Sequence, residues 1–331
     1  MSLSDNITYE DKKLLMELEY NFPFSIEPYK ELEERLNIPE DVILDKIKEF
    51  IHLQLIKRIG MYVNFRAKGL ESALVGLKIN EQYIQKFKRI ALGIREITHN
   101  YVRDHPYYNI WIVIKEPSFE DIEKKILDLN KEVPIEDYIL LYSKKTLKLN
   151  VKFDVINGIS WSPLVHKRED LSIEEFNEAL RELRMSSEFL KALSMPLPVT
   201  SRPFKQLAEK YNMTENDIVN TLKELAKLDI IRDYGATLNG DKLGITENSM
   251  VLISSDDIEN SCYDVLYNVP EATHIVLRES NKDWNYLCYF MIHGKDRRIL
   301  MNRVKERLNQ LNIKGYMMLF STSNLKPGIV M

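Results

Sequence analysis

The sequence of 331 residues is poor in cysteine, with only Cys262 and Cys288, which stand 26 positions apart. Neither a disulfide framework nor a zinc site is expected, because both need more Cys or His residues at characteristic spacings. Long apolar runs are also missing. A stretch such as residues 110–114 is far shorter than the about 20 residues that span a bilayer. We therefore expect no membrane segment.

Other common signals are absent as well. The polar, acidic residues 1–13 lack the apolar core of a signal peptide, so a cytoplasmic location is expected. The 46 basic and 50 acidic residues leave a net charge of −4, which gives no overall attraction to nucleic acid or membrane. No glycine-rich phosphate loop, His-x-x-x-His helix or nucleophile elbow occurs. Nucleotide-dependent chemistry and acyl transfer through serine are therefore not expected.

What the sequence does contain is an internal repeat. Residues 29–64 align without a gap on residues 204–239. The same offset of 175 residues relates three further pairs: Thr98 and Thr273, His99 and His274, and Arg103 and Arg278. An offset shared by so many positions indicates a duplicated unit. We expect the function to lie between two similar halves.

Each half begins with the pattern of a winged helix-turn-helix. Apolar residues at helical spacing predict three helices, and a short β-hairpin around a glycine follows them. The hairpins are expected to turn at Gly60 and Gly235. The expected helices cover residues 10–20, 29–36 and 39–54 in the first half and 187–193, 204–211 and 215–228 in the second.

After each wing the pattern predicts strand, helix, strand, strand, helix and strand, which fold into a ferredoxin-like antiparallel sheet with two helices on one face. The fold class is thus α+β, a tandem repeat of winged helix-turn-helix plus ferredoxin-like βαββαβ domain. The predicted domains are 1–66 and 67–154 in the first half, a linker at 155–171, and 172–241 and 242–331 in the second.

This layout resembles the leucine-responsive (Lrp/AsnC) regulators, which bind DNA and a small effector. A DNA-reading helix needs Lys and Arg for phosphates and base edges. The candidate recognition helices are acidic instead, and neither contains an arginine. We therefore expect retained structural modules, with a transcriptional regulator as the alternative. The acidic residues are Glu40, Asp41, Asp45 and Glu49 in the first copy and Glu215, Asp217 and Glu224 in the second.

The most unusual residues lie on the second and third strands of each predicted sheet. Side chains alternate along a strand, so residues two apart share a face. Guanidinium groups pair with carboxylates, and histidine exchanges protons near neutral pH. The pattern favours a site for a large anionic ligand; the alternative is a sheet interface with hydrogen bonds to the backbone. The residues that share a face are His99, Tyr101 and Arg103 in the first half and His274, Val276 and Arg278 in the second.

At these strands the sequence resembles the siroheme decarboxylases, which pair two related subunits or fuse them in one chain. The first half carries His99-Asn100-Tyr101-Val102-Arg103-Asp104-His105 and then Tyr108-Asn109-Ile110-Trp111, similar to the motif of one subunit type. The second half matches the other type at His274, Arg278, Asp283, Trp284, Tyr286, Tyr289, Met291, Ile292, His293 and Gly294. It departs from that type at Ile275, Val276, Glu279, Lys282, Asn285, Leu287 and Cys288. The resemblance spans nearly the entire chain and indicates a single-chain fusion.

The resemblance implies a carboxy-lyase that removes two acetate carboxylates from siroheme to give 12,18-didecarboxysiroheme, in heme or heme d1 synthesis. It implies His99 and His274 as acid/base groups, with Arg103 and Arg278 holding carboxylates. The residues assigned to substrate binding are Tyr101, His105, Tyr108, Trp111, Lys282, Asp283, Trp284, Tyr286 and His293.

No cofactor and no protein-bound metal are expected, because the iron arrives with the siroheme. His105 and His293 are candidate contacts for that iron. The expected partners are siroheme and its product, without DNA or membrane. A homodimer is an open alternative, because exposed sheet edges often pair. A tetrapyrrole carrier without catalysis is a third class of function to be tested.

Overall fold

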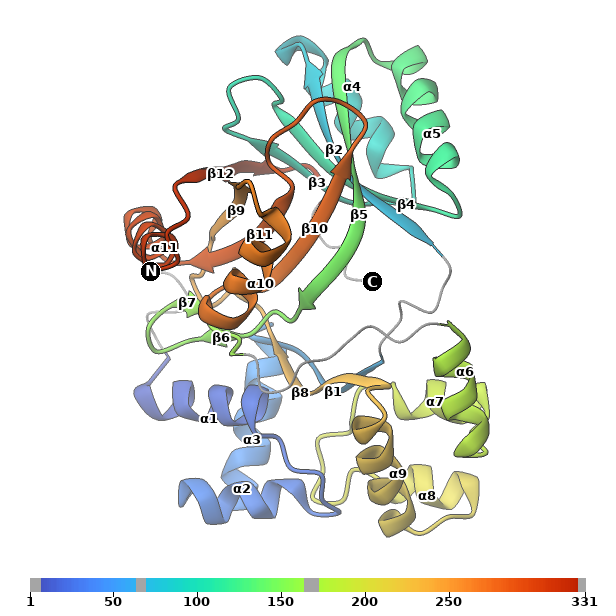
Figure 1. The fold of residues 1–331 in the computed structure, drawn as a ribbon. Coiled ribbons are helices and arrows are strands. Elements are labelled where there is room, and N and C mark those ends of the chain that lie inside the picture. Colours follow the sequence, from blue (N-terminus) through green and yellow to red (C-terminus); the bar gives the residue numbers. More distant parts are fainter. Residues whose placement is uncertain (1–6, 64–69, 164–172, 327–331) are drawn as a thin grey trace. The chain divides into compact units, whose positions relative to one another are not determined.

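The computed structural model describes residues 7–63, 70–163 and 173–326. They belong to two compact units, and each unit draws on both halves of the repeat (Figure 1). The first unit is drawn from Met1–Lys68, Lys152–Trp161 and His166–Thr246, and the second from Gly69–Val151, Ser162–Val165 and Glu247–Met331. Within the described ranges, no helix has both the length and the apolar character needed to cross a membrane.

The first unit contains both helix-turn-helix copies, whose apolar side chains form one hydrophobic core. The repeat extends to the helix ends. Asn37 follows the helix of residues 28–36 and Asn212 follows the helix of residues 205–211, and both adopt the left-handed conformation, with φ of 55° and 52°. The helices are α1 (Tyr9–Tyr20), α2 (Pro28–Leu36) and α3 (Glu40–His52) in the first copy, and α6 (Ile173–Glu182), α7 (Ser187–Leu193), α8 (Lys205–Tyr211) and α9 (Glu215–Lys227) in the second.

The predicted hairpins at Gly60 and Gly235 are wrong. Each glycine lies inside one continuous strand, and β1 (Ile56–Val63) pairs antiparallel with β8 (Ile231–Leu238), with Gly60 opposite Gly235. The glycines do not form turns; they allow other parts of the backbone to approach the strands closely. Their φ values are 146° and 141°, and a Cβ added at Gly235 would lie 2.6 Å from the carbonyl oxygen of Leu18. The two copies therefore share one ribbon.

Replacing Gly235 with alanine is expected to lower the free energy of unfolding by about 1–3 kcal/mol, because both the backbone conformation and the nearby carbonyl oppose a Cβ. Denaturant unfolding measures this loss. Gly93→Ala is the matched control, since Gly93 has φ of −79° and the new Cβ would lie 3.4 Å from the Ile90 carbonyl oxygen. Equal stability of the two variants would contradict the role of Gly235.

The second unit contains two βαββαβ domains with strand orders β5-β2-β4-β3 and β12-β9-β11-β10. This is the predicted ferredoxin-like topology. The first domain consists of β2 (Glu71–Ile79), α4 (Glu81–Leu92), β3 (Ile97–Arg103), β4 (Ile110–Glu116), α5 (Phe119–Glu132) and β5 (Ile135–Leu149). The second consists of β9 (Glu247–Ser254), α10 (Ile258–Asn268), β10 (His274–Ser280), β11 (Cys288–Gly294), α11 (Arg297–Gln310) and β12 (Gly315–Asn324).

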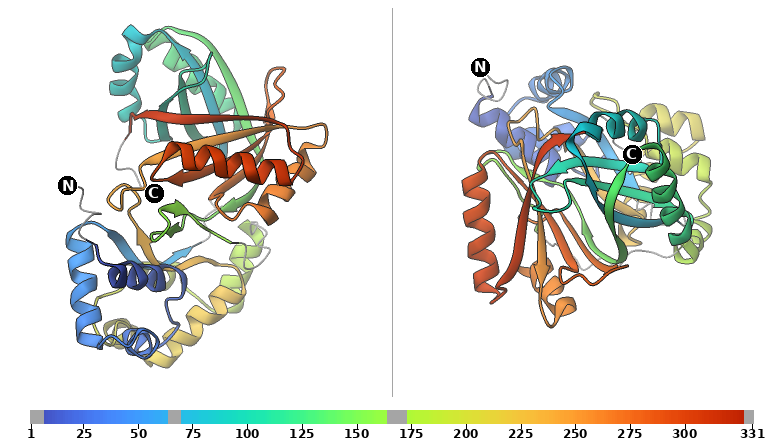
Figure 2. Two further views of the ribbon diagram at one scale, coloured as in Figure 1. Left: turned by 90° about the vertical axis from the view of Figure 1, so that its left-hand side faces the viewer. Right: turned by 90° about the horizontal axis from the view of Figure 1, so that it is seen from above.

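The two sheets join at both edges. Strand β5 pairs with β10 and β3 pairs with β12, so the eight strands close into a barrel. The helices lie on its outside, as α5 and α11 show in Figure 2. Closure uses the edge strands on which the expectation of a homodimer rested. The oligomeric state itself stays a prediction.

The expectation that the cysteines do not pair is wrong. Cys262 on α10 and Cys288 at the start of β11 form a disulfide, with their Cα atoms 5.7 Å apart. Helix α10 packs against β10 and β11, so the fold brings together two residues that the spacing in the sequence separates. Two cysteines are too few for a framework, but one bridge needs only this proximity.

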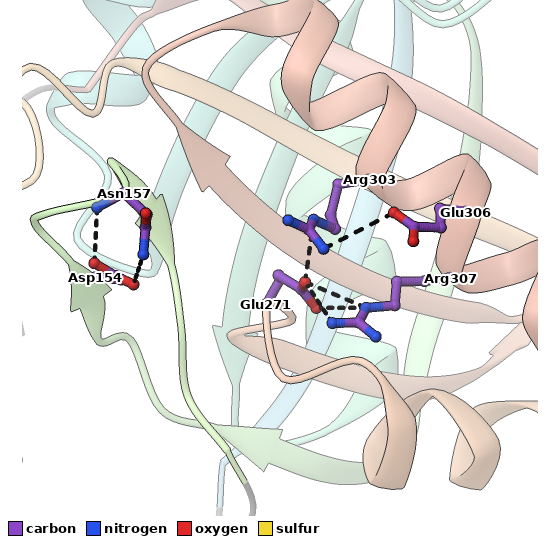
Figure 3. Close-up of polar contacts among 6 residues, drawn as sticks. All are labelled: Asp154, Asn157, Glu271, Arg303, Glu306 and Arg307. Atoms are coloured by element: carbon purple, nitrogen blue, oxygen red, sulfur yellow. Dashed lines mark hydrogen bonds and ion pairs between the residues drawn. The ribbon is translucent and has the colours of Figure 1, made fainter.

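A short hairpin spans the boundary between the predicted first domain, which ends at residue 154, and the predicted linker. Strands β6 (Phe153–Asp154) and β7 (Ile159–Ser160) pair antiparallel. The Asp154 carboxylate accepts hydrogen bonds from the backbone N–H and the side-chain amide of Asn157, at 2.8 and 2.6 Å (Figure 3). These contacts stabilise the turn. Residues 164–171 of the predicted linker lie outside the described residues.

Candidate functional site on the inner wall of the barrel

The strands of the second unit have two different faces. The outer face of the first domain packs against α4 and α5. The opposite face, which we call the inner wall, carries a cluster drawn from both domains. Its buried members are Leu74, Tyr108, Trp111, Ile139, Leu141, Met250, Leu252, Tyr289 and Leu319. Because Trp111 and Tyr289 occupy matching strands, both halves contribute to a single interior.

Strand register places the predicted histidines on this wall. Directly opposed residues in an antiparallel pair share a face. His99 lies opposite Val113, and Tyr101 opposite Trp111. In the other half His274 lies opposite Met291, and Val276 opposite Tyr289. The residues that alternate along β3 and β10 therefore face the interior in both halves.

A threonine orients each histidine in the same way. The Thr98 hydroxyl lies 3.0 Å from His99 Nδ1 and 3.3 Å from the carbonyl oxygen of Val113. Thr273 repeats this with His274 at 3.0 Å and Met291 at 3.3 Å. One arrangement satisfies all three groups: the hydroxyl donates to the carbonyl and accepts from Nδ1–H. It leaves Nε2 of each histidine as the proton acceptor.

Replacing Thr98 with valine is expected to lower kcat about tenfold, since the tautomer and ring orientation of His99 lose one hydrogen bond and a tenfold rate change corresponds to about 1.4 kcal/mol. Single-turnover kinetics with siroheme, the substrate that the sequence resemblance implies, would measure it. Thr221→Val is the control, because that hydroxyl donates to the Asp217 carbonyl one turn earlier in α9, in the other unit. An unchanged rate in Thr98→Val would contradict the proposal that Thr98 orients His99.

His99 combines contact with solvent and a low proton affinity. The residue is exposed to solvent, and nearby protein atoms still desolvate the ring. This desolvation, together with the positive charges of Lys115 and Arg103, lowers the pKa of His99 to about 4. The ring is therefore neutral at pH 7 in the unliganded protein. His274 is half-buried on the same wall.

The two arginines bridge the halves. Arg103 donates to the Leu319 carbonyl at 2.9 Å and to Asn248 Oδ1 at 3.2 Å. Arg278 donates to the Leu141 carbonyl at 2.9 Å, the mirror of the first contact. This is the interface role that the sequence left open. Burial lowers the pKa of each to about 10, so both remain charged at neutral pH.

These guanidinium groups also leave charge available. Arg103 and Arg278 are 5% and 8% exposed, and among the described residues neither forms an ion pair with a carboxylate. The Nε of Arg278 has no hydrogen-bond partner within the described ranges. The Asp104 carboxylate partly compensates the charge of Arg103. A buried cation without a directly paired carboxylate is still costly, and an anionic ligand would lower that cost. The inner wall is therefore suited to carboxylates.

His293 lies near Arg103. On β11 it faces Asn248 of β9, the residue that Arg103 contacts. Burial and the Arg103 charge lower the pKa of His293 to about 4. Asn248 was not among the predicted site residues, and no sequence signal distinguishes it. Only the pairing of β9 with β11 and β12 brings it to the site.

His105 belongs to an aromatic cluster built from both halves. Its ring centroid lies 5.6 Å from those of Tyr108 and Trp111 and 5.9 Å from that of Trp284. The N–H groups of Tyr107 and Tyr108 donate to His105 Nδ1 at 3.0 and 2.8 Å. The hydrogen of the neutral ring is then on Nε2. That tautomer suits donation to a ligand oxygen rather than coordination of iron.

The other predicted residues lie on the loop between β10 and β11. Trp284 donates through Nε1 to the Tyr289 hydroxyl at 2.8 Å, and its ring lies 5.6 Å from Tyr286. Lys282 is exposed and pairs with the carboxylate of Asp137. Asp283 is exposed as well, without a role that the structure identifies. Sequence reasoning missed Asp137, which no motif marks.

Comparison with known proteins supports the duplicated architecture. A family model described as an AsnC-like ligand-binding domain matches residues 67–148 and 242–326. A second, described as the siroheme decarboxylase NirDL-like HTH domain, matches residues 11–56 and 187–232. The chain is thus a duplicated protein of the AsnC-like class, with two helix-turn-helix copies and two ligand-binding domains.

Individual relatives identify the family more narrowly than the domain models do. The siroheme decarboxylase of Hydrogenobacter thermophilus is 22% identical over 96% of this chain and 93% of that protein. The alpha subunit of the Desulfovibrio desulfuricans enzyme is 31% identical over 44% of this chain and 84% of that subunit. The chain belongs to the siroheme decarboxylase family. The crystal structure of NirDL with an iron-uroporphyrin III analogue shares the fold, with a TM-score of 0.59 at 20% identity, covering 96% of this chain and 92% of that one.

Proposed function

We propose that this chain is a carboxy-lyase that removes two acetate carboxylates from siroheme and yields 12,18-didecarboxysiroheme. The observation that carries the proposal is the inner wall itself. There, two buried guanidinium groups without a carboxylate partner among the described residues share a face with two Thr–His pairs. The family to which the chain belongs and its relatives named siroheme decarboxylase support the same reaction.

The chemistry of siroheme matches this wall. The macrocycle is flat and carries eight carboxylates, so a site needs aromatic surfaces and cations. The partly exposed ring of Trp284 supplies aromatic surface, and the buried rings of Trp111 and Tyr108 pack behind it. Arg103, Arg278 and the rim residue Lys282 supply positive charge for carboxylates. His293, on the inner wall, is the candidate for contact with the substrate iron.

In the proposed reaction the bond between the acetate methylene and its carboxylate breaks, and carbon dioxide leaves. The electron pair stays on the methylene carbon, where the conjugated macrocycle stabilises it. A proton from His99 or His274 then gives the methyl group, and solvent restores the proton. Each cycle consumes one proton and releases one carbon dioxide, without oxidation or reduction. We propose that no added cofactor is needed.

Binding of the substrate is expected to protonate His99. Its pKa of about 4 lies below the ordinary 6.5, so the unliganded ring is neutral across that interval. Nearby carboxylates favour the charged ring and raise the pKa again. Net proton uptake is therefore expected between pH 4 and 6.5 and should fade above it. The same lowered pKa affects stability. Between pH 6.5 and 4 the His99 side chain binds a proton more readily in the unfolded chain than in the folded protein, so the unliganded protein loses stability as the pH falls through this range.

Calorimetry at pH 6 would measure the uptake, using iron-uroporphyrin as a ligand and two buffers with different ionisation enthalpies. The apparent binding enthalpy should differ between the buffers for the original protein and much less for His99→Gln. Identical enthalpies in both buffers for the original protein would contradict the expected protonation.

The direct test is anaerobic incubation of the purified chain with siroheme, followed by mass spectrometry. The proposal expects a product that lacks two carbon dioxide units, without any added cofactor. Tight binding without product would identify a carrier instead. A DNA-binding regulator is not favoured, because α3 and α9 have acidic first turns with Glu40 and Asp41, and Glu215 and Asp217.

A further inference from the structure

One carboxylate joins both halves of the aromatic cluster. Asp137, near the start of β5, accepts a hydrogen bond from the Tyr108 hydroxyl through Oδ2 at 3.1 Å. Its other oxygen, Oδ1, pairs with the ammonium group of Lys282. Tyr108 belongs to the motif of the first half, and Lys282 lies on the loop of residues 281–287 in the second. Asp137 therefore ties that loop to the other half.

The loop is also anchored at both ends. At its far end the Leu287 N–H donates to the Ile253 carbonyl at 3.2 Å. The Asn281 N–H donates to the Leu140 carbonyl at 3.1 Å, and Asn281 Oδ1 accepts from the Leu140 N–H at 2.9 Å. This pair secures only the base of the loop. Trp284, three residues on, places its ring centroid 5.9 Å from His105 and 6.1 Å from Tyr108. The indole Nε1 also donates to the Tyr289 hydroxyl at 2.8 Å. In the chain, Lys282 lies between the base and the indole, so its contact with Asp137 acts together with the Tyr289 hydrogen bond to set the position of Trp284.

We propose that Asp137 is a positioning residue that holds the 281–287 loop so that Trp284 completes an aromatic wall with His105 and Tyr108. That siroheme is the ligand of this wall rests on the proposed function. The ammonium of Lys282 has three hydrogens, so it can contact Asp137 and a ligand carboxylate together. Asp137 thus also places a cation at the rim of the wall.

The tie is modest in strength. The side chains of Asp137 and Lys282 are 29% and 41% exposed. An ion pair in contact with solvent is weak, and here one hydrogen bond supplements it. Loss of Asp137 should therefore loosen the loop without unfolding the domain.

Hydrogen exchange with mass spectrometry on the full chain tests the tie without any ligand. Asp137→Ala should speed exchange in residues 281–287 by about fivefold, in line with the loss of one weak ion pair and one hydrogen bond. Asp137→Asn should lie between, because its amide oxygen can still accept from Tyr108. Glu136→Ala is the matched control: Glu136 is the adjacent residue and pairs with Lys78 at 3.1 Å, so the loop should be unaffected.

Kinetics with siroheme tests the role of the wall. Asp137→Ala should raise KM about fivefold to tenfold and leave kcat within about twofold, since His99 and His274 keep their threonine contacts. In Lys282→Ala the further change to Asp137→Ala should raise KM less than it does in the original protein, because the ion pair is already lost and only the Tyr108 hydrogen bond remains to be removed. If Asp137→Ala acted only by destabilising the fold, its effect on KM would be the same in both backgrounds.

Unchanged exchange in Asp137→Ala overturns the tie. Faster exchange with an unchanged KM overturns the placement of the loop at the substrate. If the original protein makes no product from siroheme, the exchange experiment still decides the tie, and titration of siroheme by its absorbance replaces KM. Failure of the proposed function is thereby separated from failure of this inference.

Discussion

Replacing both His99 and His274 with alanine is expected to slow siroheme decarboxylation by at least about 100-fold, the lower end of what a positioned general acid or base contributes. Both rings lie on the inner wall with an identical threonine contact, so each is held for proton transfer. Anaerobic single-turnover assays with product analysis would measure the loss. Siroheme binding, followed by absorbance, should change far less.

The single variants show how the halves divide the work. If each half serves one acetate, His99→Ala and His274→Ala should each accumulate a monodecarboxylated product, and the two products should differ. If one half does all the chemistry, only one variant should fail. His52→Ala is the control, because His52 is exposed at the end of α3 in the other unit and should leave the rate unchanged. Full turnover by the double variant would exclude both imidazoles as acid/base groups.

Replacing Glu271 with alanine is expected to lower the free energy of unfolding by about 3 kcal/mol, because removal of one partner from a buried ion pair leaves the other without compensation. Glu271 is 0% exposed. Arg307 contacts it through Nε at 3.2 Å and Nη2 at 3.0 Å, and Arg303 through Nε at 3.5 Å (Figure 3). The arginines on α11 are partly exposed, which keeps the expected loss at the lower end of the range for buried pairs.

Denaturant unfolding monitored by circular dichroism would measure this loss. Glu306→Ala is the matched control on the same helix, because Glu306 is 58% exposed and lies 3.8 Å from Arg303. Glu306→Ala should lower the free energy of unfolding by less than about 0.5 kcal/mol. If the two variants are equally stable, the Glu271 cluster does not hold α11 on the barrel.

The sequence predicted the second unit better than the wings of the first. Alternation of polar and apolar residues along β3 and β10 reports local geometry, and it correctly placed His99 and Arg103 on one face. At Gly60 the prediction from local sequence, a hairpin turn, was wrong. A glycine in a β segment is compatible with a turn or with close approach of another backbone, and only the position of the second copy decides between them.

The candidate site shows the same division. Its histidines and arginines stood out because they recur at one offset. Asp137 and Asn248 do not recur and belong to no motif, so nothing in the sequence marks them. They reach the site through side-chain contacts between residues 145 positions apart, the hydrogen bond from Arg103 to Asn248 and the ion pair of Asp137 with Lys282.

The sequence by itself determined the duplication, the βαββαβ order of the second unit, the faces of the motif strands and the family. All of these depend on local periodicity or on residues compared along the chain. Closure of the barrel, the shared ribbon at Gly60 and Gly235, the Cys262–Cys288 bridge and the partners of Arg103 and Arg278 were decided only by the tertiary structure. They depend on which distant backbone segments meet, and pairing of that kind is set by the packing of the whole chain rather than by any local pattern.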